Sequence, residues 1–468
     1  MEKNFIHPYM PNSAPKAKNE MLKELGVDSI EDLYLDLIPD HLLFKQKMAL
    51  PEPILSEYAL KKHLEGILAK NISCDEYISF LGAGCYRHFV PAVCTEIMNR
   101  AEFLTAYCGD TYSDHGKMQA IFEYTSMLGE LLDLDVVSYT CYDAGQAVSS
   151  SLRMALRIGA GKGQKLLLPA SMNPEILSQA RIYCEGYGEI VLIDYDKETG
   201  LLDIDHLKSE LSAETAAVFL ENPTYFGGIE QNGEEIARLT HDFGAVFIVM
   251  PDLSSLGVME SPANYGADIV CGDIQPFGMN IQYGGGCAGF IAVRQEEKYI
   301  NEIPTYLYGI AKTQNEGEYG WGRALNFRCS HGSRENAKEY FGTATGLWAI
   351  TAGVYMASLG PSGIKELGET ILQKTAYAIK ELAKISSITV NQFNGFNFRE
   401  FIINFDRCKK TVKEINQSLL KYHIFGGKDL SKDFPALGQS ALYCLTEINS
   451  AEDIHKLTQA LTEIVSVK

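Results

Sequence analysis

Several turns in the sequence carry residues whose types could bind or transform a small ligand. One is Tyr142-Asp143-Ala144-Gly145-Gln146-Ala147, at the start of a stretch rich in serine and alanine. Small residues at the beginning of a helix leave backbone N–H groups free to bind an anion such as phosphate. The same residues fit an ordinary helix start that Asp143 caps. Another turn, Glu221-Asn222-Pro223-Thr224, could face a ligand or form a plain loop.

An aspartate closes the apolar segment 245–249, in the turn Met250-Pro251-Asp252. Ligands of open parallel sheets bind at the carboxyl ends of the strands. In enzymes that use pyridoxal phosphate (PLP), an aspartate there pairs with the pyridinium nitrogen of the cofactor. Asp252 could have that role, or it could cap a helix over residues 253–255.

The turn at residues 267–276 lacks the residue that PLP chemistry requires. A PLP enzyme of this kind would carry its lysine here, because the Schiff base with the cofactor needs a primary amine. Neither Gln275 nor Pro276 has one, and no lysine occurs between Lys208 and Lys298. We therefore predict a degenerate pocket that is formed by Asp143, Asp252, Gln275 and Pro276. We expect no catalytic, cofactor-binding or metal-binding residue in this chain.

Isolated basic residues are weaker candidates. His88, His115 and His331 could transfer protons, although a single histidine is more often structural. Arg328 and Arg334 could hold a carboxylate, or Arg334 could lie on a solvated helix face. The sequence contains no H-E-x-x-H, P-loop or G-x-S-x-G motif.

Alternating apolar runs and helical segments set the positions of these turns. Strands are expected at residues 165–168, 189–193, 217–220, 245–249, 268–270 and 289–293, and helices at 174–184 and 234–243. Continuous apolar strands joined by crossover helices are typical of a mostly parallel sheet that is buried on both faces. The central part of the chain is therefore predicted to be an α/β domain.

The two flanks differ from the centre. Ser29 and Ser56 are expected to cap two N-terminal helices, the second with a buried side formed by Leu60, Leu64, Ile67 and Leu68. Strands at 401–405 and 442–445, a helix at 412–422 and a last helix from Ala451 indicate a smaller α+β domain. The predicted division is an N-terminal helical arm at 1–105, a large α/β domain at 106–345 and a small domain at 346–468.

Composition excludes several classes of protein. The 41 basic and 60 acidic residues give a formal net charge of −19, which repels nucleic acids and anionic lipids. The 11 cysteines include no C-x-x-C pair, which argues against a disulfide framework and a structural zinc site and favours a cytoplasmic location. No long apolar run and no secretory start are seen.

Segments distributed over nearly the whole chain resemble one family. They are Glu20-Met21-Leu22-Lys23-Glu24-Leu25-Gly26-Val27-Asp28-Ser29-Ile30, Leu55-Ser56-Glu57-Tyr58, Phe80-Leu81-Gly82-Ala83-Gly84-Cys85-Tyr86, Gln119-Ala120-Ile121-Phe122-Glu123, Tyr265-Gly266-Ala267-Asp268-Ile269-Val270 and Leu359-Gly360-Pro361. The sequence is similar to the alpha subunit (subunit 1) of glycine dehydrogenase (decarboxylating), the P-protein of the glycine cleavage system.

The resemblance implies a fold-type-I, aminotransferase-like PLP-enzyme architecture, and a subunit that is inactive alone. It implies a beta subunit that carries the PLP lysine at the position of Pro276, in an α2β2 heterotetramer. That oxidoreductase decarboxylates glycine and passes the aminomethyl group to the lipoylated H-protein. Residues expected near the subunit interface or the active-site entrance are Tyr107, His115, Arg328, His331 and Arg334.

Two other hypotheses remain at this stage. Residues 107–116 and 338–342 depart from the family pattern, which would suit a diverged, non-catalytic paralogue, a PLP-free homodimer that binds another small anion. A self-sufficient PLP enzyme would need a lysine from elsewhere, such as Lys298 or Lys312, and both lie beyond the turn that would face the cofactor.

Overall fold

The computed structural model describes residues 6–35, 37–46, 48–103, 115–159, 163–282, 285–324, 333–338 and 344–466. Tyr107, Arg328, His331 and the side chain of His115 lie outside this described part. The chain forms two compact units, Met1–Ile72 and Ser73–Lys468. The finer division that we predict, with boundaries near residues 105 and 345, stays a prediction.

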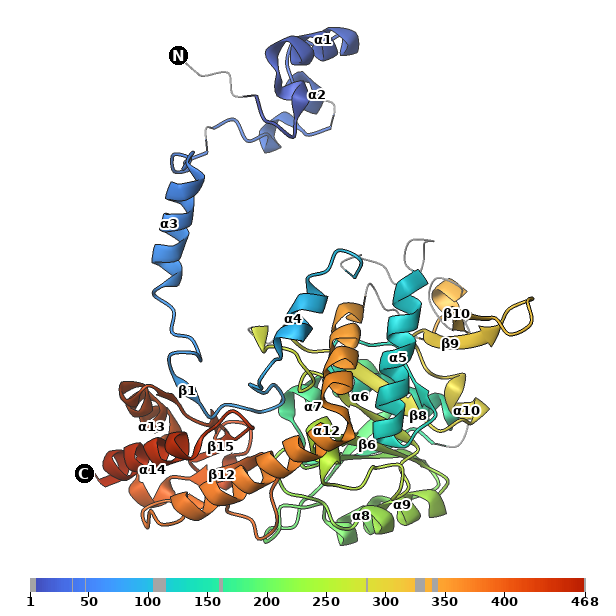
Figure 1. Cartoon of the computed structure of the whole chain (residues 1–468), viewed down its shortest axis with the longest axis vertical. Coiled ribbons are helices and arrows are strands. Elements are labelled where there is room, and N and C mark those ends of the chain that lie inside the picture. Colours follow the sequence, from blue (N-terminus) through green and yellow to red (C-terminus); the bar gives the residue numbers. More distant parts are fainter. Residues whose placement is uncertain are drawn as a thin grey trace. The chain divides into compact units, whose positions relative to one another are not determined.

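A seven-stranded sheet forms the centre of the second unit, in the order β2-β8-β7-β6-β5-β3-β4 (Figure 1). The neighbouring strands from β4 to β7 run parallel, whereas β8 is antiparallel to both β7 and β2. The mostly parallel sheet predicted from the apolar runs is therefore confirmed. The strands are β2 (Val136–Val137), β3 (Lys165–Pro169), β4 (Glu189–Ile193), β5 (Thr215–Asn222), β6 (Val246–Pro251), β7 (Ile269–Asp273) and β8 (Gly289–Val293).

Helices cover both faces of this sheet. Leu166 and Leu168 of β3 belong to one apolar cluster together with residues of α6 (Ala144–Ile158) and α7 (Pro174–Cys184). Leu167, which points the other way, belongs to a second cluster with residues of α5, α9 and α12. Alternate residues of one strand thus enter different cores, as a sheet buried on both faces requires. Those three helices are α5 (His115–Leu132), α9 (Gly233–Asp242) and α12 (Gly346–Leu382).

A smaller four-stranded sheet, in the order β11-β12-β15-β14, follows the long helix α12. It packs with α13 (Val412–Leu419) and α14 (Ala451–Ser466) around a separate apolar cluster. The strand β12 (Glu400–Asn404) is central to the site, because the residues at its start meet the large sheet. The other strands are β11 (Thr389–Val390), β14 (Lys428–Asp429) and β15 (Ser440–Cys444), and a hairpin is formed by β9 (Leu307–Lys312) and β10 (Tyr319–Ala324).

The N-terminal unit contains α1 (Pro15–Leu25), α2 (Asp32–Leu35) and α3 (Glu57–Leu68). The two predicted caps are present: Asp32 N–H donates to Ser29 Oγ over 3.2 Å, and Ala59 N–H donates to Ser56 Oγ over 3.3 Å.

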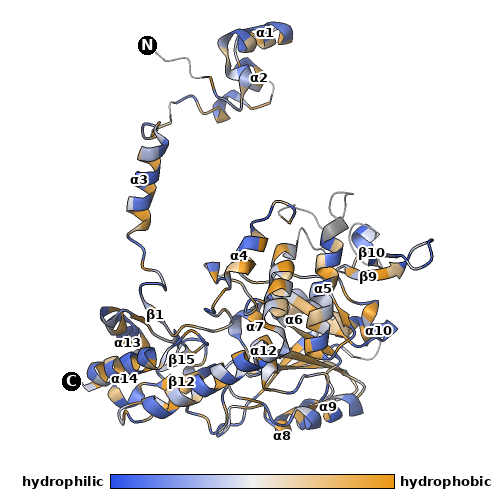
Figure 2. Ribbon diagram, in the orientation of Figure 1, coloured by the Kyte–Doolittle hydropathy of each residue, from blue (hydrophilic) through white to orange (hydrophobic). Residues whose placement is uncertain are grey.

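The predicted buried side of the second N-terminal helix is wrong, because α3 has no buried residue. Leu60, Leu64, Ile67 and Leu68 are 42–61% exposed, and Figure 2 shows the apolar residues along this helix. An apolar stripe on a helix indicates that another surface packs against it. The stripe does not show whether that surface belongs to the same chain or to a different one. Within the described residues, no helix has the length and apolar character needed to span a membrane.

Candidate functional site

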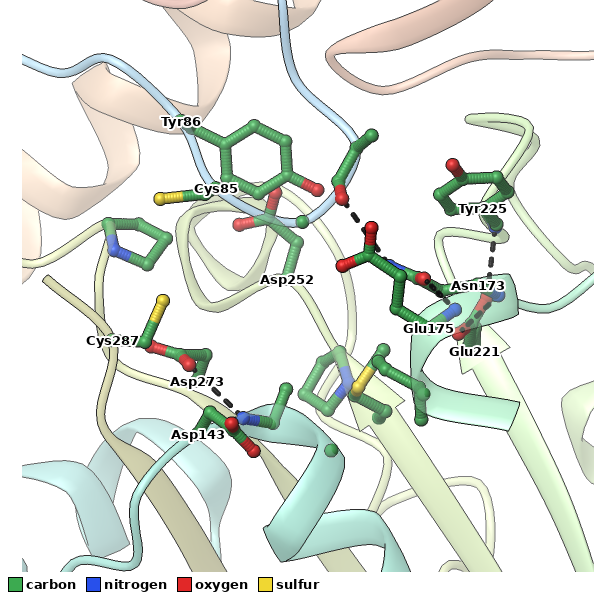
Figure 3. A pocket seen from close by; sticks show the side chains of 18 of the residues that line it. Cys85, Tyr86, Asp143, Asn173, Glu175, Glu221, Tyr225, Asp252, Asp273 and Cys287 are labelled. Carbon is green, nitrogen blue, oxygen red and sulfur yellow. Dashed lines mark hydrogen bonds between the residues drawn. The ribbon is translucent and has the colours of Figure 1, made fainter. Parts of the chain in front are cut away.

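A pocket of about 460 Å³ lies at the carboxyl ends of the central strands. It is lined by the starts of α6 and α7, by the ends of β5, β6 and β7, and by Arg399 and Glu400 next to the start of β12. Of the predicted residues, Asp143, Asp252 and Pro276 line this pocket. Gln275 is completely buried next to it. Figure 3 shows the side chains that surround the cavity.

Carboxylates already occupy the helix start that the sequence suggested for an anion. Asp143 caps α6 and accepts a hydrogen bond of 2.7 Å from the N–H of Gln146. Asp273, at the end of β7, accepts a 3.1 Å bond from the N–H of Ala144. Two carboxyl groups thus accept hydrogen bonds from N–H groups that a phosphate would use, and Asp143 caps the helix.

Asp252 is paired with a cation from its own chain. Its Oδ2 lies 3.0 Å from Nε of Arg399, whose side chain is fully buried. The guanidinium also lies 4.0 Å from the ring centroid of Tyr86. The carboxylate that would meet a pyridinium nitrogen in a PLP enzyme is therefore neutralised internally. Asp252 also accepts a 2.9 Å bond from Ser254 N–H, at the start of a 3-10 helix.

Sequence reasoning missed Arg399. The available signal was a single arginine at the start of a very apolar strand, Phe398-Arg399-Glu400-Phe401-Ile402-Ile403. Charged side chains are seldom fully buried without a partner. This rule predicts that a buried arginine has a charged or polar partner. Nothing in the sequence identifies Asp252, 147 positions away, as the partner of Arg399.

Gln275, in the turn where a lysine would be expected, acts as a backbone clamp. Its Oε1 accepts from Tyr86 N–H over 2.9 Å, and its Nε2 donates to the carbonyl of Tyr86 over 2.7 Å and to that of Met279 over 3.0 Å. Both ends of the amide are thus satisfied. No lysine occurs among the described residues that line the pocket.

Buried carboxyl groups dominate the rest of the wall. Glu221 accepts hydrogen bonds from the N–H groups of Asn173 and Tyr225, yet burial raises the pKa of Glu221 to about 8. Glu400 accepts from Ala83 N–H over 2.6 Å, and burial raises the pKa of Glu400 to about 7. Asp273 behaves alike, because burial raises its pKa to about 7.

These residues do not fit PLP. Among the described lining residues, Arg399 is the only basic one, and it is already paired with Asp252. A phosphate would meet the carboxyl groups of Asp143 and Asp273 at the start of α6, and none of the described lining residues offers an amine for a Schiff base. The degenerate pocket stays a prediction, and the charges of the described lining residues are its physical argument.

Of the remaining candidates, His88, Arg334, Lys298 and Lys312 are not among the described residues that line this pocket. The buried ring of His88 contacts Glu447, with 2.7 Å between Nδ1 and Oε2. Although burial opposes it, this ion pair and hydrogen bonds lower the pKa of Glu447 to about 2. Arg334 is exposed in a short 3-10 helix, and Lys298 and Lys312 are exposed as well. The described residues contain no group that could hold a metal ion.

The chain is similar to known proteins over nearly its whole length. The pattern of the family described as "Glycine cleavage system P-protein" matches residues 7–461. A protein of Pyrococcus abyssi named "Probable glycine dehydrogenase (decarboxylating) subunit 1" is 39% identical, over 98% of this chain and 99% of the relative. The chain belongs to the glycine cleavage system P-protein family. A relative of the same name from Staphylothermus marinus is 35% identical, over 98% of each chain.

Solved structures place the chain within the same family and fold. A crystal structure of glycine decarboxylase (P-protein) in inhibitor-bound form matches 96% of this chain and 98% of its own, with 29% identity and a TM-score of 0.84. A NifS-like protein, at 12% identity and a TM-score of 0.63, shares the fold alone. The P-protein chain described here therefore has the fold-type-I architecture that the resemblance implied.

Proposed function

We propose that this P-protein chain is the subunit of a two-part glycine decarboxylase that does not hold PLP. The observation that carries the proposal is the turn Asp273-Ile274-Gln275-Pro276, which ends a parallel strand at the pocket without offering an amine. Relatives named subunit 1 imply a second subunit, and we assign the PLP lysine to that partner. There, PLP would act as the electron sink for decarboxylation.

The work of this chain is then positioning. A subunit that supports a neighbour's active site needs rigid, well-packed backbone at the contact. The central sheet provides this, because its strands are buried on both faces. We assign no step of glycine decarboxylation to this chain's own pocket, and Asp143, Asp252, Gln275 and Pro276 are structural in this proposal.

The proposal extends to partners. The exposed apolar residues of α3 (Leu60, Leu64, Ile67 and Leu68) suit a surface that the second subunit covers. We further propose an α2β2 assembly in the cytoplasm that receives the lipoylated H-protein. Its contact residues would include Tyr107, His115, Arg328, His331 and Arg334, the residues that the resemblance assigns to the interface or the entrance.

The test is co-expression with a candidate subunit 2 from the same organism, followed by size-exclusion chromatography and a glycine–bicarbonate exchange assay with H-protein. We expect a stable complex whose exchange activity is absent from either subunit alone. A chain that elutes alone and adds nothing to the exchange would overturn the proposal. The alternative of an anion-binding homodimer is not favoured by the relatives, and the carboxyl groups of the pocket count against it.

A further inference from the structure

The chain contains two Asn-Gly pairs, Asn232-Gly233 and Asn394-Gly395. The side-chain amide of an asparagine can be attacked by the backbone nitrogen of the next residue. Glycine permits this attack best, because it has no side chain and its backbone reaches more conformations than that of any other residue. The attack also requires that the peptide group between the two residues can turn, and the structure holds the two pairs differently in this respect.

The peptide group of the first pair is held at the start of a helix. Gly233 is the first residue of α9, and the carbonyl of Asn232 accepts a 2.9 Å hydrogen bond from Ile236 N–H. Asn232 N–H donates to Oε1 of Glu230 over 3.0 Å. Gly233 is buried, and a Cβ added to it would lie 2.8 Å from a ring carbon of Tyr265. This peptide group therefore cannot turn unless the first turn of α9 opens.

The second pair lies in the loop before β12, and its peptide group is open. Asn394 and Gly395 are both exposed, and so is the following Phe396. Within the described residues, the carbonyl of Asn394 accepts no hydrogen bond and the N–H of Gly395 donates none. Apart from its chain neighbours, no described atom lies within 4 Å of the place where a Cβ of Gly395 would be. This peptide group is therefore free to turn.

The backbone on both sides of this open peptide group is anchored. Asn394 N–H donates to the carbonyl of Glu198 over 2.7 Å, and the carbonyl of Phe396 accepts a 3.0 Å bond from Ile229 N–H. Both anchors lie outside the atoms that have to move, which are the side chain of Asn394 and the peptide group after it. The folded loop thus presents a single free peptide group at the surface.

We propose that Asn394 is a site of spontaneous deamidation in the folded chain. The Gly395 nitrogen bonds to Cγ of Asn394, the bond from Cγ to Nδ2 breaks, and Nδ2 leaves as ammonia with the proton of the Gly395 N–H. Water then opens the cyclic imide. Its attack at Cγ gives aspartate, and its attack at the main-chain carbonyl carbon gives isoaspartate. Water is consumed and ammonia is released, with no oxidation or reduction.

The products differ from asparagine in charge and in backbone length. Both carry a carboxylate that adds a negative charge to the exposed loop, and isoaspartate also adds a carbon to the main chain between the two anchors. The hydrogen bonds from Asn394 to Glu198 and from Ile229 to Phe396 should then weaken. The amide hydrogen of Ile229 should exchange faster in the modified chain, because its protection depends on the local opening of this contact.

The experiment incubates the full-length chain in warm neutral buffer prepared with heavy-oxygen water. Peptide mass spectrometry at successive times measures the heavy oxygen that enters each asparagine, and fragmentation distinguishes isoaspartate from aspartate. We expect Asn394 to react at least about tenfold faster than Asn232, because a helix turn has to open before Asn232 can react. In denaturant the two rates should become similar, since both sites are then unstructured Asn-Gly pairs. The chain alone suffices, so the result is independent of whether a partner subunit binds.

A variant and its control test the site itself. N394Q keeps an amide but lengthens the side chain, so heavy-oxygen uptake in that peptide should fall at least about tenfold, because the reacting atoms lose their alignment. Q392A changes another exposed residue of the same loop and should leave the rate at Asn394 unchanged. A melting curve establishes that each variant is folded. Equal rates at Asn394 and Asn232 in the folded chain would overturn the proposal, and so would an Asn394 that reacts only after denaturant is added.

Discussion

The pocket and the helix α3 differ in whether the chain itself provides contacts for their side chains. In the pocket, Arg399 is paired with Asp252, and Glu221 and Glu400 accept hydrogen bonds from the chain itself. Along α3, by contrast, no residue is buried and the apolar positions stay exposed. Under the proposed function, the internal ion pair of the pocket and the exposed apolar positions of α3 both suit a chain that supports another protein.

The largest expected effect concerns the open surface. Replacing Leu60, Leu64 and Ile67 together by serine should weaken binding of subunit 2 by about 100-fold or more. Each buried leucine or isoleucine contributes roughly 1.5–3 kcal/mol, and about 1.4 kcal/mol corresponds to a factor of ten. The measurement is a titration of subunit 2 by calorimetry or by analytical size exclusion.

The matched control changes the polar side of the same helix. Lys61 and Glu65 form an exposed ion pair of 3.8 Å, and replacing both by serine should leave affinity within about twofold. The prediction is wrong if the triple serine variant binds subunit 2 normally but has a lower melting temperature. The apolar side of α3 would then be covered by the chain itself.

The second effect tests whether the pocket is internally closed. Asp252→Ala leaves the buried guanidinium of Arg399 without its carboxylate, and removing one partner of a buried ion pair costs about 3–5 kcal/mol. Chemical denaturation should report that loss in the free energy of unfolding. The double variant with Arg399→Leu should recover most of it, because no buried charge then remains. A single variant as stable as the unaltered chain would show that Arg399 finds another partner or water.

The third effect is a pH dependence with a defined sign. Burial raises the pKa of Glu221 to about 8 from an ordinary value of 4.5, so the folded chain keeps a proton that the unfolded chain releases. The free energy of unfolding should therefore fall as pH rises from about 4.5 to about 8. Asp273 and Glu400, each with a pKa near 7, add to the same fall.

Glu221→Gln should make this fall smaller by about 2–4 kcal/mol, since each pKa unit corresponds to about 1.4 kcal/mol. The comparison is the slope of stability against pH, which is insensitive to a constant loss from the altered hydrogen bond. Glu175→Gln removes an exposed carboxyl group at the rim of the same pocket and serves as the control. An unchanged slope in the Glu221 variant would contradict the buried, protonated state of this residue.

Much of the fold follows from local pattern, because buried strands and their crossover helices leave continuous apolar runs. The predicted helix at 174–184 and strand at 189–193 coincide with α7 and β4. The prediction of a degenerate pocket depends on a missing lysine, which can be read from the sequence alone. The pairing of Arg399 with Asp252 and the clamp from Gln275 to Tyr86 were not. They join positions 147 and 189 residues apart, and only the packed structure brings such positions together.

The smallest expected effect lies at the start of α3. Ser56 accepts the hydrogen bond of Ala59 N–H, and replacing an N-cap serine by alanine costs about 1 kcal/mol of helix stability. If α3 serves the partner, Ser56→Ala should leave the melting of the chain alone unchanged. It should weaken subunit 2 binding by at most about fivefold, because the partner then has to order a less stable helix. Faster hydrogen exchange confined to the first turn of α3 would locate the loss, and Ser56→Asp, which keeps a capping oxygen, should restore the affinity. A lower melting temperature for Ser56→Ala alone would mean that α3 stabilises its own chain, and the contrast between a closed pocket and an open helix would then fail.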